Sequence, residues 1–247
     1  GVKPCVVLLH GFPELAYTWR NQLLPLAQAG FHAVAPDLRG YGRSTTSAVA
    51  HEDDLLPYSM LNRVSDVVGL VRALGYENVA AVVGHDWGAP TAQWCARLRP
   101  DVFRSVVSMS TPFLHAPTLP LGPASVRKNA ETKSDMDTEL AALPHPRKHY
   151  YSYSASDRAN EDMWRAPQGV HDLLRALYHF KSADWAGNKP FPLASWTASE
   201  LAKMPTYYIM DLEKGIAETV AAEMPSKADI AKCKWMTEEE LRVYSAE

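Results

Sequence analysis

The sequence has 247 residues, which is enough for one large domain or two small ones. Apolar residues make up 47% and charged residues 21%, an ordinary balance that excludes a mainly disordered, collagen-like or coiled-coil chain. Lys and Arg number 25 against 28 Asp and Glu, a formal charge of −3. We therefore expect neither nucleic acid nor an anionic membrane surface as a partner.

The sequence contains no apolar run near the roughly 18 residues that span a bilayer, so no membrane span is expected. Its first residues do not resemble a signal peptide. The three cysteines are widely spaced, at Cys5, Cys95 and Cys233. They indicate reduced packing residues, neither a disulfide framework nor a metal site. We expect a cytoplasmic protein, with the peroxisome as the alternative location, and no metal or cofactor.

The first half of the chain alternates between strand and helix patterns. Short apolar runs predict strands over residues 5–9, 31–35, 79–83 and 103–109, and helical spacing predicts helices over 19–29, 59–74 and 90–97. Ser59 is a candidate helix N-cap, and Gly30 and Gly75 are expected helix stops. This alternation predicts an α/β fold with a parallel sheet covered by helices on both faces, whose ligands bind at the carboxyl ends of the strands.

The second half has a different character. It holds most of the prolines and shows no strand–helix alternation, and the helical patterns at 172–180, 199–204 and 237–246 are separated by Pro- and Lys-rich loops. We predict two domains, a core over residues 1–113 and a mostly helical insertion or second domain over 114–247.

The segment Gly84-His85-Asp86-Trp87-Gly88 lies between a predicted strand and a predicted helix. A nucleophile on so sharp a turn needs small residues two positions away on either side, and Gly84 and Gly88 satisfy this. The central residue is Asp86, already ionised at neutral pH and suited to displacement at a saturated carbon, which forms an alkyl ester. The alternative is that Asp86 only caps the following helix.

A second loop, His10-Gly11-Phe12-Pro13, follows the first strand. In such an architecture this loop supplies one backbone N–H of an oxyanion hole, here that of Phe12, and the Trp87 N–H supplies the other. A simple turn built on Gly11 and Pro13 is the alternative. We expect His10 and His85 to support the backbone of these loops.

Together these segments resemble the α/β-hydrolase superfamily, and specifically its epoxide-hydrolase branch. The matching motifs, in the family's order and spacing, are His10-Gly11-Phe12-Pro13-Glu14, Asp37-Leu38-Arg39-Gly40-Tyr41-Gly42-Arg43-Ser44, Gly84-His85-Asp86-Trp87-Gly88 and Ser110-Thr111-Pro112-Phe113. The resemblance implies an incomplete α/β-hydrolase sheet with a mostly helical cap insertion over residues 114–247. It also implies a cis peptide bond between Phe12 and Pro13.

The resemblance further implies that Asp86 attacks an epoxide carbon, and that water then cleaves the alkyl ester to a vicinal diol. A cap tyrosine would protonate the opening ring, since a phenol stays protonated at neutral pH. Tyr150 matches the family's first such tyrosine best, and Tyr151 and Tyr153 are fallbacks; packing of these rings is the alternative. The implied partners are a small apolar epoxide and water.

The residues that the family uses for ester hydrolysis, a His and its acid, have no counterpart in this sequence, and neither has the second cap tyrosine. The chain resembles a member truncated at both ends, so we expect it to alkylate Asp86 and stall.

Two other functions stay open at this point: a haloalkane dehalogenase with the same Asp nucleophile, and a non-catalytic ligand-binding protein of this fold. Six apolar side chains of the second half are candidates to line a hydrophobic tunnel, with packing of the cap as the alternative: Trp164, Phe180, Trp185, Phe191, Trp196 and Met204.

Overall fold

A computed structural model describes residues 3–44, 53–113 and 136–247. The chain divides into two compact units, Gly1–Ala116 with Glu247, and Pro117–Ala246. The predicted domain boundary after residue 113 adjoins residues 114–135, which are outside the described residues.

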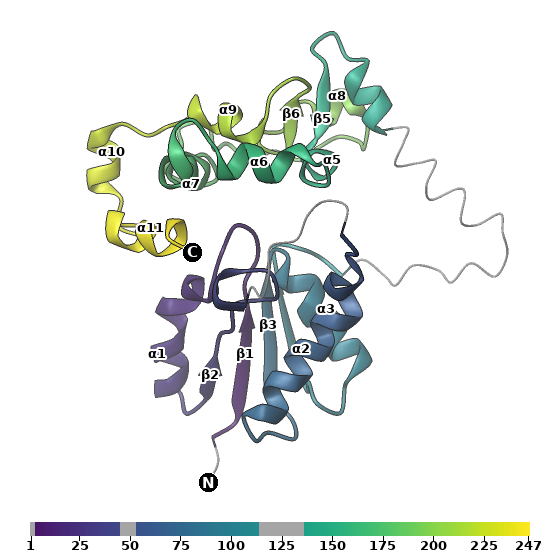
Figure 1. The fold of residues 1–247 in the computed structure, drawn as a ribbon, viewed down its shortest axis with the longest axis vertical. Coiled ribbons are helices and arrows are strands. Elements are labelled where there is room, and N and C mark those ends of the chain that lie inside the picture. Colours follow the sequence, from purple (N-terminus) through teal and green to yellow (C-terminus); the bar gives the residue numbers. More distant parts are fainter. Residues whose placement is uncertain (1–2, 45–52, 114–135) are drawn as a thin grey trace, which may run out of the picture. The chain divides into compact units, whose positions relative to one another are not determined.

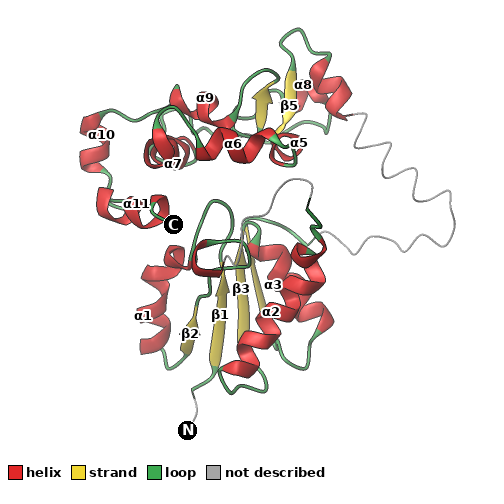
Figure 2. Ribbon diagram, in the orientation of Figure 1, coloured by secondary structure: helices red, strands yellow, loops and turns green. Residues whose placement is uncertain are grey.

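The first unit is built on a four-stranded parallel sheet (Figures 1 and 2). The strand order is β2-β1-β3-β4, and the strands are β1 (Cys5–Leu9), β2 (His32–Val34), β3 (Ala81–His85) and β4 (Val106–Met109). Its helices are α1 (Arg20–Gln28), α2 (Met60–Ala73) and α3 (Gly88–Leu98). In the register of the sheet, Val7 pairs with both Val34 and Val82, and His85 pairs with Met109.

Both faces of the central strand β1 are buried, which explains its continuous apolar sequence. Alternate residues point to opposite faces. Cys5, Val7 and Leu9 join a core cluster with side chains of α2 and α3, whereas Val6 and Leu8 pack with Trp19 on the other face. The prediction of helices on both faces is therefore confirmed.

Several element bounds differ from the predicted ones; β4, for example, starts at Val106, three residues later than predicted. Strand β3 starts at Ala81, two residues later than predicted, and Val79 forms only an isolated bridge to Phe103. Helix α3 starts at Gly88 and not at residue 90. Ser59 occupies the N-cap of α2, but its side chain makes no capping hydrogen bond.

The expected helix stops are confirmed. Gly30 and Gly75 follow α1 and α2 with φ values of 94° and 81°, a region that favours glycine.

Strand β4 lies at one edge of the sheet, and three of its side chains are exposed although apolar: Val106, Val107 and Met109.

The second unit is mostly helical. Its described helices are α5 (Tyr150–Ser154), α6 (Arg158–Trp164), α7 (Gly169–Phe180), α8 (Ala198–Leu201), α9 (Ile216–Ala221), α10 (Lys227–Lys232) and α11 (Glu238–Ser245). Helix α7 supplies much of the core through Leu173, Leu174, Ala176, Leu177 and Phe180.

The second unit also contains a two-stranded antiparallel sheet that the sequence did not predict. Strand β5 (Arg147–His149) pairs with β6 (Ile209–Asp211), and an ion pair of 2.5 Å between Arg147 and Asp211 joins their ends. Strand β5 reads Arg-Lys-His, so it carries none of the apolar alternation by which strands are found.

Arg175 of α7 is buried and ties this helix to the segment before α11. One terminal nitrogen donates to the Met236 carbonyl oxygen at 2.9 Å, and the other donates to Glu238 Oε1 at 2.6 Å.

Within the described residues, no helix has the length and apolar character needed to cross a membrane.

Candidate active site

The turn between β3 and α3 holds Asp86 in a strained conformation. Its φ is 51°, the left-handed region that non-glycine residues rarely occupy. A Cβ on Gly84 would lie 2.7 Å from the Ala89 Cα, and one on Gly88 would lie 2.6 Å from the His10 carbonyl oxygen. The two glycines are therefore required because neighbouring backbone passes too close for any side chain. Strain of this kind collects at functional sites.

The Asp86 carboxylate faces the loop after β1. Its Oδ1 accepts a hydrogen bond of 3.0 Å from the Phe12 backbone N–H. The alternative that Asp86 caps the helix is wrong: Trp87 occupies the N-cap of α3, and no side chain makes a capping hydrogen bond there. The backbone of Asp86 is fixed as well, because its N–H donates to the Met109 carbonyl oxygen at 3.3 Å and its carbonyl accepts from Ala89 at 3.0 Å.

The backbone of the loop after β1 lies against the Asp86 side chain. The Phe12–Pro13 peptide bond is cis, as the resemblance implies. A Cβ on Gly11 would lie 2.8 Å from the Asp86 Cγ, so a larger residue there would collide with the carboxylate. The side chains of Phe12 and Trp87 are 39% and 41% exposed.

Glu14 connects this loop to the turn around Asp86, a role that the sequence did not predict. Its Oε2 accepts the Gly11 N–H at 2.9 Å and lies 3.2 Å from His85 Nδ1. Burial raises the pKa of Glu14, but the His85 and Gly11 hydrogen bonds outweigh it, and the net shift is downward. The signal was the position of Glu14, three residues after Gly11 in a tight turn.

His10 fixes the same loop from inside the protein. Its Nε2 accepts the Leu38 N–H at 2.9 Å, so the proton of a neutral ring lies on Nδ1 and is donated to the Gly11 carbonyl oxygen at 2.8 Å. Burial lowers the pKa of His10, and the Gly11 carbonyl and nearby carboxylates only partly oppose this. Both predicted supporting histidines therefore bind loop groups.

Tyr150 belongs to the second unit, where it starts helix α5. Its N–H donates to the Tyr208 carbonyl oxygen at 2.9 Å, and its ring lies 5.2 Å from the Tyr208 ring and 4.3 Å from that of Tyr151. His149 precedes it at the N-cap, where Nδ1 accepts the Tyr151 N–H at 3.2 Å.

Tyr153, one of the two fallbacks, has a buried hydroxyl with a different task. It donates a very short hydrogen bond to Asp162 Oδ2 and accepts the Ile216 N–H at 3.2 Å. Burial and the Asp162 hydrogen bond both raise the pKa of Tyr153. The hydroxyl proton of Tyr153 is therefore donated within the second unit. Tyr151 is exposed. Because Tyr153 has this other task, Tyr150 and Tyr151 are the remaining candidates for a proton donor.

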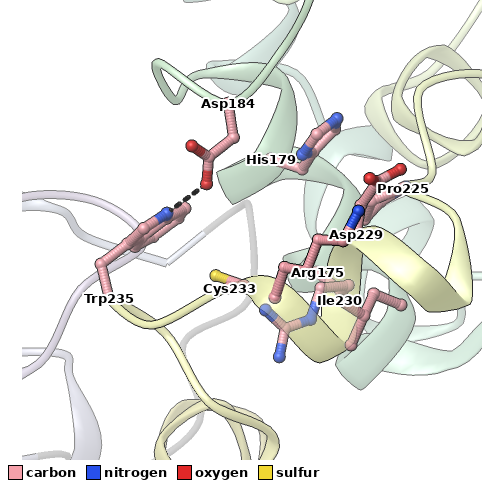
Figure 3. Close-up of a pocket in the computed structure, with 9 residues that line it drawn as sticks. Arg175, His179, Asp184, Pro225, Asp229, Ile230, Cys233 and Trp235 are labelled. Atoms are coloured by element: carbon pink, nitrogen blue, oxygen red, sulfur yellow. Dashed lines mark hydrogen bonds between the residues drawn. The ribbon is translucent and has the colours of Figure 1, made fainter.

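The second unit contains a cavity of about 250 Å³ with both acidic and basic lining residues, which Figure 3 shows as sticks. There the Trp235 indole N–H donates to Asp184 Oδ2 at 2.7 Å, and Arg175 and His179 lie on the other side.

In the parts of the chain that the structure describes, no group of three or more His, Cys, Asp or Glu side chains could hold a metal ion.

Comparison with known proteins agrees with this architecture. Residues 4–213 match the family model described as alpha/beta hydrolase fold, so the chain belongs to the α/β-hydrolase-fold family. An epoxide hydrolase of Caballeronia sordidicola is 46% identical over 114 residues, which are 46% of this chain and 33% of that protein. Epoxide hydrolase B of Mycobacterium tuberculosis is 51% identical over 110 residues, 44% of this chain and 29% of that protein.

Solved structures lead to the same branch. An epoxide hydrolase from an endophytic Streptomyces has a TM-score of 0.70 at 33% identity, covering 100% of this chain and 62% of that one. Epoxide hydrolase A from Mycobacterium thermoresistibile has a TM-score of 0.68 at 27% identity, covering 99% of this chain and 63% of that one. The expected resemblance is confirmed, and the chain spans about a third of the length of the curated relatives it matches.

Proposed function

We propose that this chain carries the nucleophilic step of an epoxide hydrolase, with Asp86 as the nucleophile. One observation carries the proposal: a carboxylate stands at the centre of a strained strand-to-helix turn, with Oδ1 bound by the Phe12 N–H. An exposed structural aspartate needs neither the strain nor the two glycines packed against backbone. The epoxide hydrolases among its relatives support the choice of substrate.

The proposed first step forms an ester. Because Oδ1 accepts the Phe12 N–H, we assign the attack on the epoxide carbon to Oδ2. The carbon–oxygen bond of the ring breaks, its electron pair goes to the ring oxygen, and the Tyr150 phenol protonates that oxygen. The phenolate regains its proton from water.

The second step needs water and a base. Attack on the ester would place negative charge on Oδ1, where the N–H groups of Phe12 and Trp87 stabilise it. The products are a vicinal diol and free Asp86. We assign the His85–Glu14 pair to holding the loop, and identify no base among the described residues. We therefore expect the ester to accumulate on this chain.

Intact-protein mass spectrometry after incubation with excess styrene oxide tests this function. We expect a stable gain of one substrate mass that Asp86→Ala abolishes and Asp101→Asn retains, since Asp101 is an exposed carboxylate paired with Arg99. Released diol without an adduct would mean that a base exists in this chain. Halide released from a bromoalkane, with no reaction on styrene oxide, would favour a dehalogenase.

We infer the same partners, role and location for the protein as the sequence suggests. Its partners are a small apolar epoxide and water, its role is detoxification of epoxides, and its location is the cytoplasm or the peroxisome. The three cysteines support a reducing compartment, because all are free and Cys5 and Cys95 are buried.

A further inference from the structure

The second unit contains a cavity of about 430 Å³ with aromatic walls. It lies between the loop after α7 and the segment before β6, and four of its lining residues are aromatic: Trp185, Phe191, Tyr207 and Tyr208. Met204 adds an adaptable apolar surface. The volume lies within the range of small-molecule sites, and flat aromatic walls favour a ligand with an aromatic ring.

The walls of this cavity are held in place before any ligand arrives. Phe180 is buried behind them, with its ring 4.6 Å from that of Trp185 and 4.7 Å from that of Tyr207. The Trp185 indole N–H donates to Glu223 Oε2 at 2.7 Å, which fixes the plane of the indole. A ligand that enters a preformed site has little ordering cost to offset.

Phe191 is the exception, because half of its side chain is exposed to solvent. An exposed aromatic ring on the wall of an otherwise fixed cavity gains most when a ligand covers it. Phe191 is therefore the residue whose removal should weaken binding most.

The residues that line the cavity include two lysines and no acidic residue. Lys189 and Lys203 line it, and Lys181 Nζ lies 5.7 Å and 5.6 Å from the ring centres of Tyr207 and Tyr208. Lys203 already pairs with Glu200, whereas Lys189 forms no ion pair with any carboxylate among the described residues. This excess favours a ligand that carries a negative group next to its aromatic ring.

Tyr208 links the cavity to Tyr150. It lines the cavity, its ring lies 5.2 Å from the Tyr150 ring, and its carbonyl accepts the Tyr150 N–H. A ligand in the cavity would therefore lie one ring away from the proposed proton donor. We propose that this cavity is a binding site for a small molecule that carries an aromatic ring bearing a carboxylate. The inference goes beyond the proposed function and does not depend on it.

Isothermal titration of the whole chain with 2-naphthoate, and with its uncharged analogue 2-naphthylmethanol, tests the site. We expect saturable binding of naphthoate that Phe191→Ala weakens about tenfold. Lys189→Gln should weaken naphthoate about threefold and leave naphthylmethanol unchanged. Trp164→Ala is the matched control, because Trp164 is an exposed aromatic of the same unit outside the cavity lining. Circular dichroism in the aromatic region verifies that each variant is folded.

Several outcomes would overturn the inference: no saturable binding, equal affinity in wild type and Phe191→Ala, or an equal loss in Trp164→Ala. An equal effect of Lys189→Gln on both ligands would overturn the choice of a charged substituent. Naphthoate binding without any adduct overturns the proposed function and leaves the cavity as a ligand site.

Discussion

The two units hold their proposed reactive residues by different means. In the first unit the backbone fixes Asp86: glycines at 84 and 88 let neighbouring main chain approach, and the Phe12 N–H binds the carboxylate. In the second unit side chains fix Tyr150, through ring contacts to Tyr151 and Tyr208. The backbone N–H of Tyr150 also donates a hydrogen bond to the Tyr208 carbonyl oxygen.

This difference predicts how each site tolerates change. Backbone that passes within contact distance cannot move aside for a new atom. A larger residue at Gly84 or Gly88 should therefore cause a large loss of stability and not a graded one. Side-chain contacts are numerous and individually weak, so substitutions around Tyr150 should give graded losses.

The largest effect is expected for Gly88→Ala. Its Cβ would lie 2.6 Å from the carbonyl oxygen of His10, a buried residue that directly follows β1. We expect a loss of about 4 kcal/mol or more in unfolding free energy, measured by urea denaturation. Gly69→Ala is the matched control, because Gly69 lies inside α2 with nothing within 4 Å of a new Cβ. It should gain about 0.5–1 kcal/mol from the better helix former. Similar values for the two variants would contradict the close approach.

A smaller loss is expected in the second unit when the hydrogen bonds of Tyr153 are removed. Tyr153→Phe leaves Asp162 and the Ile216 N–H without their buried partner, which should cost about 1–3 kcal/mol. Asp162→Asn tests the same contact from the other side. A double-mutant cycle by urea denaturation should show that the two losses are not additive. Additive losses would mean that Tyr153 and Asp162 act independently.

The same contrast explains what the sequence could predict. The parallel sheet, its helices and the sharp turn at Asp86 were predictable because a buried strand, a stop glycine and a pair of glycines around Asp86 are local patterns. The tight loop after β1 was predictable for a similar reason, since Gly11 and Pro13 mark a special backbone.

The second unit was less predictable because long-range side-chain contacts define it. Strand β5 contains no apolar residue and is defined by its pairing with β6. The tie between Tyr153 and Asp162 joins two short helices that carry no strong apolar period. The grouping of Trp185, Phe191 and Met204 in one cavity depends on a loop fold that no local pattern specifies, although all three were candidates for an apolar lining.

A pH effect of intermediate size is expected in the first unit. Burial lowers the pKa of His10, so the unfolded chain takes up a proton near pH 6.5 while the folded chain stays neutral. Stability is therefore complete above this pH and falls as the pH drops from about 6.5 toward the lower pKa of the folded state, by at most about 1.4 kcal/mol per pH unit. Urea denaturation between pH 7.5 and 5.5 should show a steeper slope for wild type than for His10→Gln. Identical slopes would show that His10 is not kept neutral by burial.

The smallest effect should come from a helix cap of the second unit. Thr237 accepts the Glu240 N–H at 3.2 Å, and the Glu240 carboxylate accepts the Thr237 N–H at 2.8 Å, a reciprocal cap at the start of α11. Thr237→Ala should cost about 1 kcal/mol, seen as faster amide exchange in α11. Thr197 occupies the same position in α8 without a capping hydrogen bond, so Thr197→Ala should change exchange there little. Equal acceleration in both helices would show that residue type, and not the side-chain contact, determines stability at these ends.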